Sequence, residues 1–292
     1  MTAPPNSRSA CEHLKQLLHQ RRAVPAPGCH DALGALLVEQ AGFEAVSLSG
    51  YAVAASHGKP DIGLITATQM ADHAAHITQT VSIPLVADAD TGYGAISNVA
   101  QTVQAYERQG VAALHLEDQV NPKRCGAMAS KALASDEEMS QRIRAAVASR
   151  REMLIIGRTD ALTIAGLDEV IRRCKRMADD GVDAVMVPSL SSLQDIETVV
   201  RHSPVPVLHT VAETVRPLFS QAELASTGLG MALYSISLIQ AVVHVQQRIL
   251  AELRSQGSTA ALVDQMTPLN QITGLLGAAR YADFENRIVS GT

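Results

Sequence analysis

Short apolar runs alternate with amphipathic stretches along most of this chain, and this alternation constrains the fold more than any other feature. Eight runs have the length of buried strands: Ala23–Pro27, Ala45–Ser49, Leu85–Asp88, Ala113–Glu117, Leu154–Arg158, Ala184–Val187, Val207–Thr210 and Met231–Tyr234. The stretches between them have helical spacing: Asp31–Gln40, Thr68–Thr80, Ile96–Gln109, Asp136–Ser149, Asp168–Asp180, Leu193–Val200 and Gln221–Ser226. Strands that alternate with helices form a parallel sheet with helices outside. Eight such units predict an α/β protein with a (β/α)8 TIM barrel fold.

The junctions between helices and strands support this prediction. A glycine stands where each of four predicted helices ends, at Gly42, Gly110, Gly181 and Gly228. A doubly wound open sheet is the alternative, but no GxGxxG turn supports it. We find no linker and no low-complexity segment. We therefore expect residues 1–292 to form a single barrel domain with a C-terminal helical extension from about residue 236, with helices over Ile236–Gln256 and Ser258–Ile288.

Composition excludes several classes of partner. The 24 basic and 29 acidic residues give a net charge of −5 without a basic run, which argues against nucleic acid and anionic membranes. No apolar run is long enough to span a bilayer, and the polar start is not followed by the apolar segment of a signal peptide, so we expect a cytoplasmic protein. Four dispersed cysteines, without a CxxC motif, suit a reducing compartment.

Carboxylates gather where two predicted strands end. Asp88 and Asp90 are two residues apart, so their side chains share one face of an extended segment. Gly92 and Gly94 permit a sharp turn beside them. Two convergent carboxylates repel each other unless a cation or a shared proton neutralises them. Hard oxygen ligands, without a nearby histidine pair or thiolate cluster, favour Mg²⁺ or Mn²⁺ over zinc.

Polar side chains end four of the predicted strands, namely Ser49, Asp88, Glu117 and Arg158. In a TIM barrel the chemistry takes place at the carboxyl ends of the strands. Any one of these residues alone could be a charge in a surface loop. Four strand ends together indicate an active site.

The chain resembles the isocitrate lyase and phosphoenolpyruvate mutase superfamily from about Gln20 to its C-terminus. The resemblance rests on Ser47-Leu48-Ser49-Gly50, Lys59-Pro60-Asp61, Asp88 to Gly94, His115 to Gln119, Asn121 to Gly126 and Gly157 to Ala161. The segment from Glu117 to Gly126 is most similar to methylisocitrate lyases and carboxyphosphoenolpyruvate phosphonomutases. The resemblance implies a Mg²⁺-dependent barrel, a small carboxylate substrate, and a homotetramer in which a C-terminal helix is exchanged between subunits.

By this resemblance, Asp88 binds the metal directly and three other carboxylates hold its water shell, namely Asp90, Glu117 and Asp61. Mg²⁺ gives up its waters reluctantly, which suits this division. The segment around Asp61 also has the sequence of an ordinary turn.

The resemblance also assigns the substrate contacts. The planar guanidinium of Arg158 suits a substrate carboxylate or an enolate oxygen; the alternative is a structural ion pair with Glu117 or Asp160. Ser49 and the backbone N–H groups of Gly50 and Tyr51 would hold the other end of the dianion. The remaining substrate-binding candidates are Gly126, Thr210 and Glu213.

Cys125 is the expected general acid. Nearby Lys123 and Arg124 would lower the pKa of its thiol and make it reactive, and in lyases of this superfamily the matching cysteine protonates the carbanion left by C–C cleavage. Its loop, about residues 121 to 131, is expected to close over the substrate. Lys123 and Glu117 are also catalytic candidates. His115 is another, with a structural histidine as the alternative.

The expected reaction is retro-aldol cleavage of a 2-hydroxy di- or tricarboxylate to a 2-oxo acid through an enolate-type intermediate. Three positions depart from the lyase pattern: Ala127 replaces histidine, Pro188 replaces glutamate and Thr210 replaces asparagine. These departures point to a different distal group on the substrate. The alternatives are a phosphonomutase acting on a P–C bond, an oxaloacetate decarboxylase or hydrolase, and a barrel that only binds its ligand.

Overall fold

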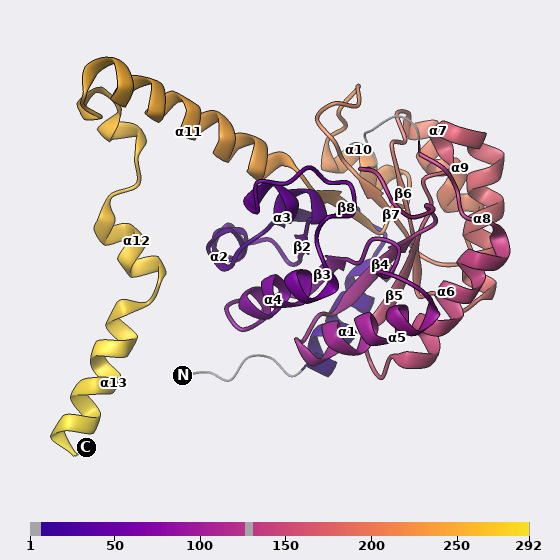
Figure 1. The fold of residues 1–292 in the computed structure, drawn as a ribbon, viewed down its shortest axis with the longest axis horizontal. Coiled ribbons are helices and arrows are strands. Elements are labelled where there is room, and N and C mark those ends of the chain that lie inside the picture. The colour runs from indigo at the N-terminus through magenta and orange to yellow at the C-terminus, as the bar shows by residue number, and fades with distance from the viewer. Residues whose placement is uncertain (1–6, 126–130, 292) are drawn as a thin grey trace. The chain divides into compact units, whose positions relative to one another are not determined.

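The computed structural model describes residues 7–125 and 131–291. Eight parallel strands close into a barrel in sequence order, with the last strand paired to the first (Figure 1). They are β1 (Val24–Cys29), β2 (Val46–Leu48), β3 (Leu85–Asp88), β4 (Ala113–Glu117), β5 (Leu154–Arg158), β6 (Ala184–Pro188), β7 (Val207–Thr210) and β8 (Met231–Tyr234). The predicted TIM barrel is therefore confirmed, and each of the eight predicted strands is present within two residues of its expected ends.

Helices alternate with the strands along the chain and also make up the C-terminal segment. They are α1 (Ser7–His19), α2 (Ala32–Gln40), α3 (Gly50–Ser56), α4 (Ala67–Thr78), α5 (Ile96–Arg108), α6 (Asp136–Ser149), α7 (Leu162–Ala165), α8 (Leu167–Asp179), α9 (Leu193–His202), α10 (Gln221–Ser226), α11 (Ser237–Gln256), α12 (Leu269–Leu275) and α13 (Ala278–Ser290), with a 3₁₀ turn at Ala260–Gln265. Three of them, α1, α3 and α7, were not expected from the sequence.

The helix predicted over Ser258–Ile288 is interrupted. Pro268 precedes α12, and proline lacks the backbone N–H that a continuing helix needs. Gly277 precedes α13 with a left-handed φ of 72°, which no helix interior adopts. The sequence therefore predicts helical content here but misses two breaks.

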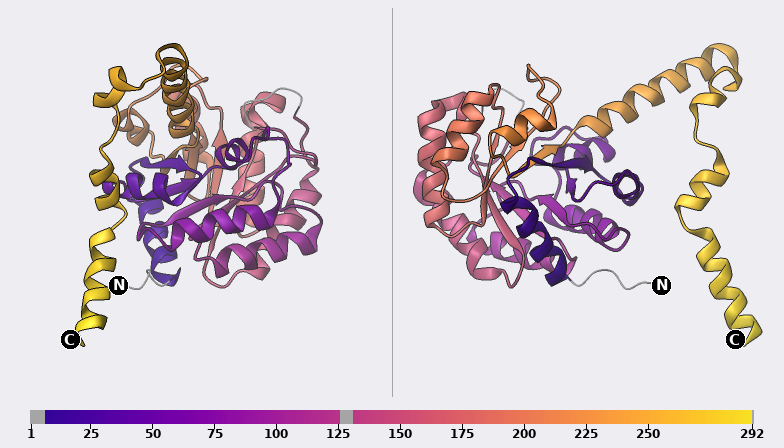
Figure 2. Two further views of the ribbon diagram at one scale, coloured as in Figure 1. Left: turned by 60° about the vertical axis from the view of Figure 1, so that its left-hand side comes forward. Right: turned by 180° about the vertical axis from the view of Figure 1, so that it is seen from behind.

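The hydrophobic core has two layers. One lies between the strands and the surrounding helices. The other fills the barrel and includes three fully buried leucines of α1, namely Leu14, Leu17 and Leu18. Each buried leucine contributes about 2 kcal/mol of hydrophobic stabilisation. Helix α1, drawn in indigo in Figure 2, thus closes the amino-terminal end of the strands and leaves the carboxyl end for a site.

The described residues divide into two compact units. One is the barrel, which extends to Ile239, and the other is the helical segment from Gln240 onward. No described helix is long and apolar enough to cross a membrane.

Candidate active site

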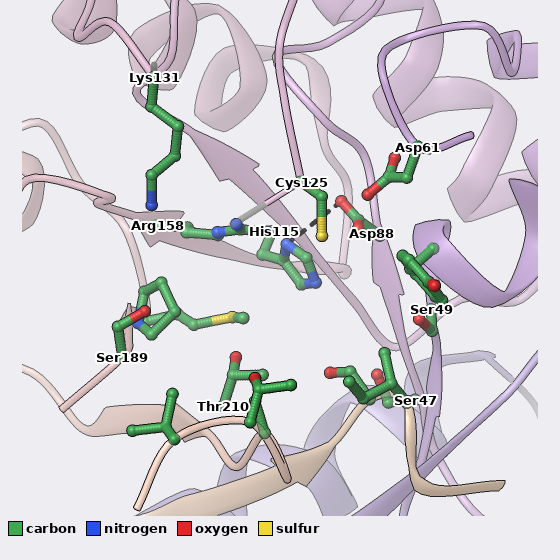
Figure 3. A pocket seen from close by; sticks show the side chains of 18 of the residues that line it. Ser47, Ser49, Asp61, Asp88, His115, Cys125, Lys131, Arg158, Ser189 and Thr210 are labelled. Atoms are coloured by element: carbon green, nitrogen blue, oxygen red, sulfur yellow. Dashed lines mark ion pairs between the residues drawn. The ribbon is translucent and has the colours of Figure 1, made fainter. Parts of the chain in front are cut away.

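A cavity of about 920 Å³ opens at the carboxyl ends of the strands (Figure 3). Eight residues predicted from the sequence line it: Ser49, Tyr51, Asp61, Asp88, His115, Cys125, Arg158 and Thr210. Thr210 lines the opposite side, at the end of β7. The barrel therefore brings together residues that are up to 161 positions apart in sequence, counting from Ser49 to Thr210.

Asp88 ends β3 and is held from several directions. The hydroxyl of Tyr106 on α5 donates a hydrogen bond of 2.9 Å to the Asp88 backbone carbonyl. The Asp88 side chain accepts one of 3.0 Å from the backbone N–H of Asp90. Burial alone would raise the pKa of Asp88. Electrostatic interactions with His115, Lys123 and Arg158 and the hydrogen bond from Asp90 outweigh burial and lower this pKa to about 2, so Asp88 carries a full negative charge.

The ammonium group of Lys123 forms ion pairs with both Asp90 and Asp61. Lys123 Nζ lies 2.8 Å from Asp90 Oδ1 and also forms an ion pair with Asp61. Its side chain is only 3% exposed. Burial opposes the charge on Lys123, but the surrounding carboxylates raise its pKa above the usual value. The sequence predicts a metal cation between Asp88 and Asp90, and it does not predict that Lys123 neutralises Asp61 and Asp90.

The turn that carries Asp90 is conformationally demanding. Asp90 has a left-handed φ of 46° and Gly92 a φ of 92°. A Cβ on Gly92 would lie 2.5 Å from Val99 on α5, so glycine is required both for its φ and for this close approach. Burial raises the pKa of Asp90 to about 7, with the Asp88 charge adding to the effect and Lys123 opposing it.

Glu117 and His115 lie on β4 and are almost completely buried, with 1% and 3% exposure. Neither oxygen of Glu117 accepts a hydrogen bond from a described residue. Burial raises the pKa of Glu117 well above its usual value. Burial also lowers the pKa of His115 to about 4, so the imidazole is neutral at pH 7. His115 Nδ1 lies 3.6 Å from Asp88 Oδ1.

Arg158, at the end of β5, forms both ion pairs that the sequence offered as its structural alternative. Nη1 lies 3.0 Å from Glu117 Oε2, and Nη2 lies 3.0 Å from Asp160 Oδ2. The guanidinium nevertheless lines the cavity, and its Nε, which is buried, has no hydrogen-bond partner among the described residues. The two carboxylates therefore fix the plane of the guanidinium while it faces the cavity.

Cys125 is half-buried, and its sulfur points into the cavity between Asp61 and Arg158 (Figure 3). Its backbone N–H donates to the Asp61 carbonyl at 3.1 Å, which ties this loop to the loop after α3. Gly126 and Ala127, both singled out from the sequence, lie outside the described residues.

The predicted anion loop is the start of a helix. Ser49 is the N-cap of α3, and its hydroxyl accepts a hydrogen bond of 3.3 Å from the backbone N–H of Ala52. Gly50 and Tyr51 form the first turn, where backbone N–H groups have no acceptor within the helix. Gly50 is needed for close approach, because a Cβ there would lie 2.7 Å from Asp88 Oδ2.

The far side of the site holds the remaining predicted residues. The hydroxyl of Thr210 is buried without a partner among the described residues. Glu213 is not among the described lining residues, and one of its oxygens accepts a hydrogen bond from Ser237. Elsewhere in the site, Asp90, Glu117 and Lys123 are also not among the described lining residues.

The donor set fits Mg²⁺ held mostly through water. Among the described residues, no three His, Cys, Asp or Glu side chains lie close enough together to hold a metal by themselves. Asp88 is ionised and faces the cavity, and Oε1 of Glu117, which has no hydrogen-bond partner among the described residues, is available to an ordered water. One direct carboxylate with waters held by others is a common arrangement for Mg²⁺.

Sequence reasoning missed two lining residues with evident roles. Lys131 forms an ion pair of 3.3 Å with Asp160 and reaches the cavity beside Arg158. Ser189 follows β6 with a left-handed φ of 67°, which turns the chain along the cavity edge. The position of Ser189 two residues after a predicted strand was the available signal. Lys131 offered none, because its ion pair depends on how the loop folds back.

Known proteins resemble this chain along almost its whole length. The family model described as phosphoenolpyruvate phosphomutase matches residues 14–254. A 2,3-dimethylmalate lyase of Eubacterium barkeri is 35% identical over 282 residues, which cover 95% of this chain and 98% of that protein. A 2-methylisocitrate lyase of Aeropyrum pernix is also 35% identical, with coverage of 94% of this chain and 88% of the relative.

Solved structures agree with the sequence matches. An oxaloacetate acetylhydrolase bound to 3,3-difluorooxalacetate superposes with a TM-score of 0.90 at 32% identity, covering 97% of both chains. A phosphonopyruvate hydrolase in complex with oxalate and Mg²⁺ superposes with a TM-score of 0.87 at 30% identity, covering 96% of this chain and 99% of that one.

Proposed function

The chain belongs to the phosphoenolpyruvate phosphomutase family, and we propose that it is a Mg²⁺-dependent lyase that cleaves a C–C bond of a 2-hydroxy di- or tricarboxylate and releases a 2-oxo acid. The family match and the relatives confirm the resemblance inferred from the sequence. The relatives named as lyases support the reaction class. The observation that carries the proposal is the convergence of Asp88, Arg158 and Cys125 on one cavity.

Arg158 binds and orients the substrate in this proposal. A guanidinium held between Glu117 and Asp160 presents fixed donors to a carboxylate or to the oxygen where negative charge develops. Donors that are already in place lower the barrier without having to reorganise during the reaction. Glu117, which is buried and paired with Arg158, holds the guanidinium in this orientation.

Cys125 supplies the proton that ends the reaction. When the C–C bond breaks, the 2-hydroxyl carbon becomes a carbonyl and the bonding electron pair stays on the departing carbon. The Cys125 sulfur faces the same cavity as Arg158 and is placed to protonate that carbon. Simple binding of a carboxylate would not require a thiol at this position, so the thiol favours catalysis.

Asp88 would hold Mg²⁺ directly, with Asp90, Glu117 and Asp61 holding its waters. When bound, the metal would polarise the substrate hydroxyl and carboxylate as a Lewis acid. Lys123 keeps Asp61 and Asp90 close together by offsetting their mutual repulsion. The Mg²⁺ in the phosphonopyruvate hydrolase structure supports this metal for the family site.

Conservative variants of the proposed catalytic residues test this function. We expect Arg158→Lys, which loses the planar fork, and Cys125→Ser, which loses the acidic thiol, to lower kcat about a hundredfold to a thousandfold. The measurement is Mg²⁺-dependent release of 2-oxo acid from a panel of 2-hydroxy di- and tricarboxylates. Cys174→Ser, in a buried cysteine on α8, is the matched control and should retain kcat. Full activity in Cys125→Ser would remove the thiol from the mechanism.

A P–C bond reaction is the second candidate, because the matching family model is described as a phosphomutase. The same metal site and Arg158 would serve a phosphonate. Cys125 favours the lyase, since transfer of a phosphoryl group requires no carbon protonation. Phosphorus NMR with phosphonopyruvate separates the two reactions.

The setting of the enzyme is proposed from the same family membership. We propose a cytoplasmic homotetramer in which C-terminal helices pack between subunits. Apolar side chains exposed on these helices support the packing, among them Leu250, Leu269 and Ile288. No feature of the sequence favours nucleic acid or membrane as a partner.

A further inference from the structure

Two histidines on neighbouring helices face each other outside the active site. His57 is the C-cap residue of α3, and His73 lies on α4, which packs against α3 (Figure 1). Their Nε2 atoms are 3.1 Å apart. Neither residue is among the described lining residues of the active-site cavity. His57 lies about 12 Å along the helix axis from Ser49, so the histidine pair is a separate feature of the barrel.

A hydrogen bond fixes which nitrogen of His73 carries the proton. Nδ1 of His73 is hydrogen-bonded to the backbone carbonyl of His30. A carbonyl oxygen only accepts, so Nδ1 is the donor and Nε2 of the neutral ring has a lone pair. Histidines that bind metals almost always donate their other ring N–H in this way, to a carbonyl, a carboxylate or water. His73 is therefore held in the tautomer and orientation of a metal ligand.

His57 supplies a second imidazole that can adjust its position. Its side chain is exposed, and among the described residues its ring makes a hydrogen bond only with His73. Rotation of this ring therefore breaks no other contact. Its exposure also lets water reach the pair, and water would take the coordination positions that the two rings leave open.

The separation of the two nitrogens matches that of two ligands on one ion. Two nitrogens bound at about 2.0–2.1 Å lie about 2.9 Å apart at a right angle and about 3.4 Å apart at the tetrahedral angle. The observed 3.1 Å lies between these values. The ring centroids are 5.3 Å apart and the ring planes meet at 61°, so the rings face each other nearly end to end. A tilt of the exposed His57 ring would direct both lone pairs at one ion.

The ligand type separates this site from the Mg²⁺ site. Imidazole nitrogen suits Zn²⁺, Cu²⁺ and Ni²⁺, whereas Mg²⁺ prefers carboxylate and water oxygens. The active site offers the ionised carboxylate of Asp88, and the histidine pair offers two nitrogens. Each site therefore selects a different class of metal ion.

We propose that His57 and His73 bind a divalent late transition-metal ion such as Zn²⁺, with water completing its coordination. The bound ion would join the C-terminal end of α3 to α4. The opposite end of α3 carries Ser49 and Gly50 at the active site, so the ion would hold in place a helix that shapes the cavity. This inference does not depend on the reaction that the enzyme catalyses.

Calorimetric titration of the full chain with Zn²⁺ tests the proposal. Excess Mg²⁺ is present throughout, so that the carboxylate site is occupied. We expect a site for one Zn²⁺ per chain whose affinity falls at least about tenfold in His57→Gln and in His73→Gln, because loss of a ligand costs at least as much as loss of an outer hydrogen-bond partner. His57→Gln keeps the hydrogen bond between His73 and His30, so the test holds even where His73→Gln fails to fold.

His202 provides the matched control. It is an exposed histidine on α9 whose Nδ1 lies 2.8 Å from the backbone carbonyl of Thr198, and no second imidazole is paired with it among the described residues. We expect His202→Gln to bind Zn²⁺ as the wild type does. Unchanged Zn²⁺ affinity and stoichiometry in His57→Gln would overturn the proposal, and so would an equal loss in His202→Gln.

Thermal unfolding gives a second readout. A ligand that binds only the folded chain raises its melting temperature. We expect Zn²⁺ to raise the melting temperature of the wild type and of His202→Gln more than that of His57→Gln. An equal rise in all three chains would contradict a site that joins α3 to α4.

Discussion

At the scale of single residues, Gly50 packs directly against the side chain of Asp88. A Cβ at position 50 would lie 2.7 Å from Asp88 Oδ2, closer than van der Waals contact permits. We expect Gly50→Ala to displace the Asp88 carboxylate and to lower kcat about a hundredfold, since catalytic geometry tolerates displacements of less than 1 Å. The measurement is Mg²⁺-dependent turnover together with the melting temperature, which separates a local effect from unfolding.

A second glycine provides the control for this prediction. Gly274 lies in α12, and a Cβ there would meet no atom within 4 Å. Gly274→Ala should leave kcat unchanged, because the added methyl group meets no other atom. It should not disturb the helix either, since alanine suits a helix better than glycine. Normal turnover in Gly50→Ala would show that Asp88 moves without consequence and would contradict its proposed role as the direct metal ligand.

Individual site residues were predictable where they end a strand. Ser49, Asp88, Glu117 and Arg158 were expected at the carboxyl end of the barrel, and the structure places all four there. The position of Lys123 between Asp61 and Asp90 was not predictable. It depends on two loops that are 62 residues apart in sequence, and no local pattern encodes that contact.

At the scale of secondary-structure elements, charged side chains join α6 to α8. Arg172 on α8 donates two hydrogen bonds to Asp136 in the first turn of α6, at 2.6 and 2.9 Å. These hydrogen bonds lower the pKa of Asp136 below its usual value. A carboxyl group whose pKa is lowered by folding stabilises the native state above its unfolded pKa, and this stabilisation is lost as the pH falls through the folded pKa.

The pH dependence of a charge-neutral variant tests this link. We expect Asp136→Asn to lower the free energy of unfolding by about 1 kcal/mol at pH 7, because the pair is partly exposed to solvent. The difference from the wild type should shrink as the pH falls below about 4. Urea unfolding at several pH values measures it. Glu137→Gln, which changes a more exposed acid of the same turn, is the control and should change the free energy of unfolding less. If the difference between Asp136→Asn and the wild type grew towards low pH, the stabilising role of the Asp136 carboxylate would be refuted.

Elements were predictable in proportion to their length and periodicity. The strands and the long helices of the barrel follow directly from alternating hydrophobicity. Helix α3 is seven residues long and consists largely of alanine and other small or apolar residues, so it has no polar face to reveal it. Pro268 and Gly277 mark the breaks before α12 and α13 in the sequence. The helical pattern around these two residues nevertheless predicted one continuous helix.

At the scale of the whole molecule, the C-terminal helices expose apolar side chains that a monomer would leave in water. Leu269 is 79% exposed, and Val289 is 88% exposed. We expect the full chain to form an oligomer, and we expect removal of residues 258–292 to give a smaller species with its barrel intact. Light scattering coupled to gel filtration, with circular dichroism on both chains, measures this. A monomeric full chain would contradict the proposed assembly.

The central claim is that Arg158 and Cys125 act together on a C–C bond at the carboxyl end of the barrel. The most direct measurement is proton NMR of the products formed from a 2-hydroxy dicarboxylate with Mg²⁺ in deuterated water. We expect one 2-oxo acid for each carboxylate product, with one deuterium on the carbon that was bonded to C2. In Cys125→Ser, this deuterated product should be lost. Products without this deuterium, or a change seen only in the phosphorus spectrum of a phosphonate, would contradict the account.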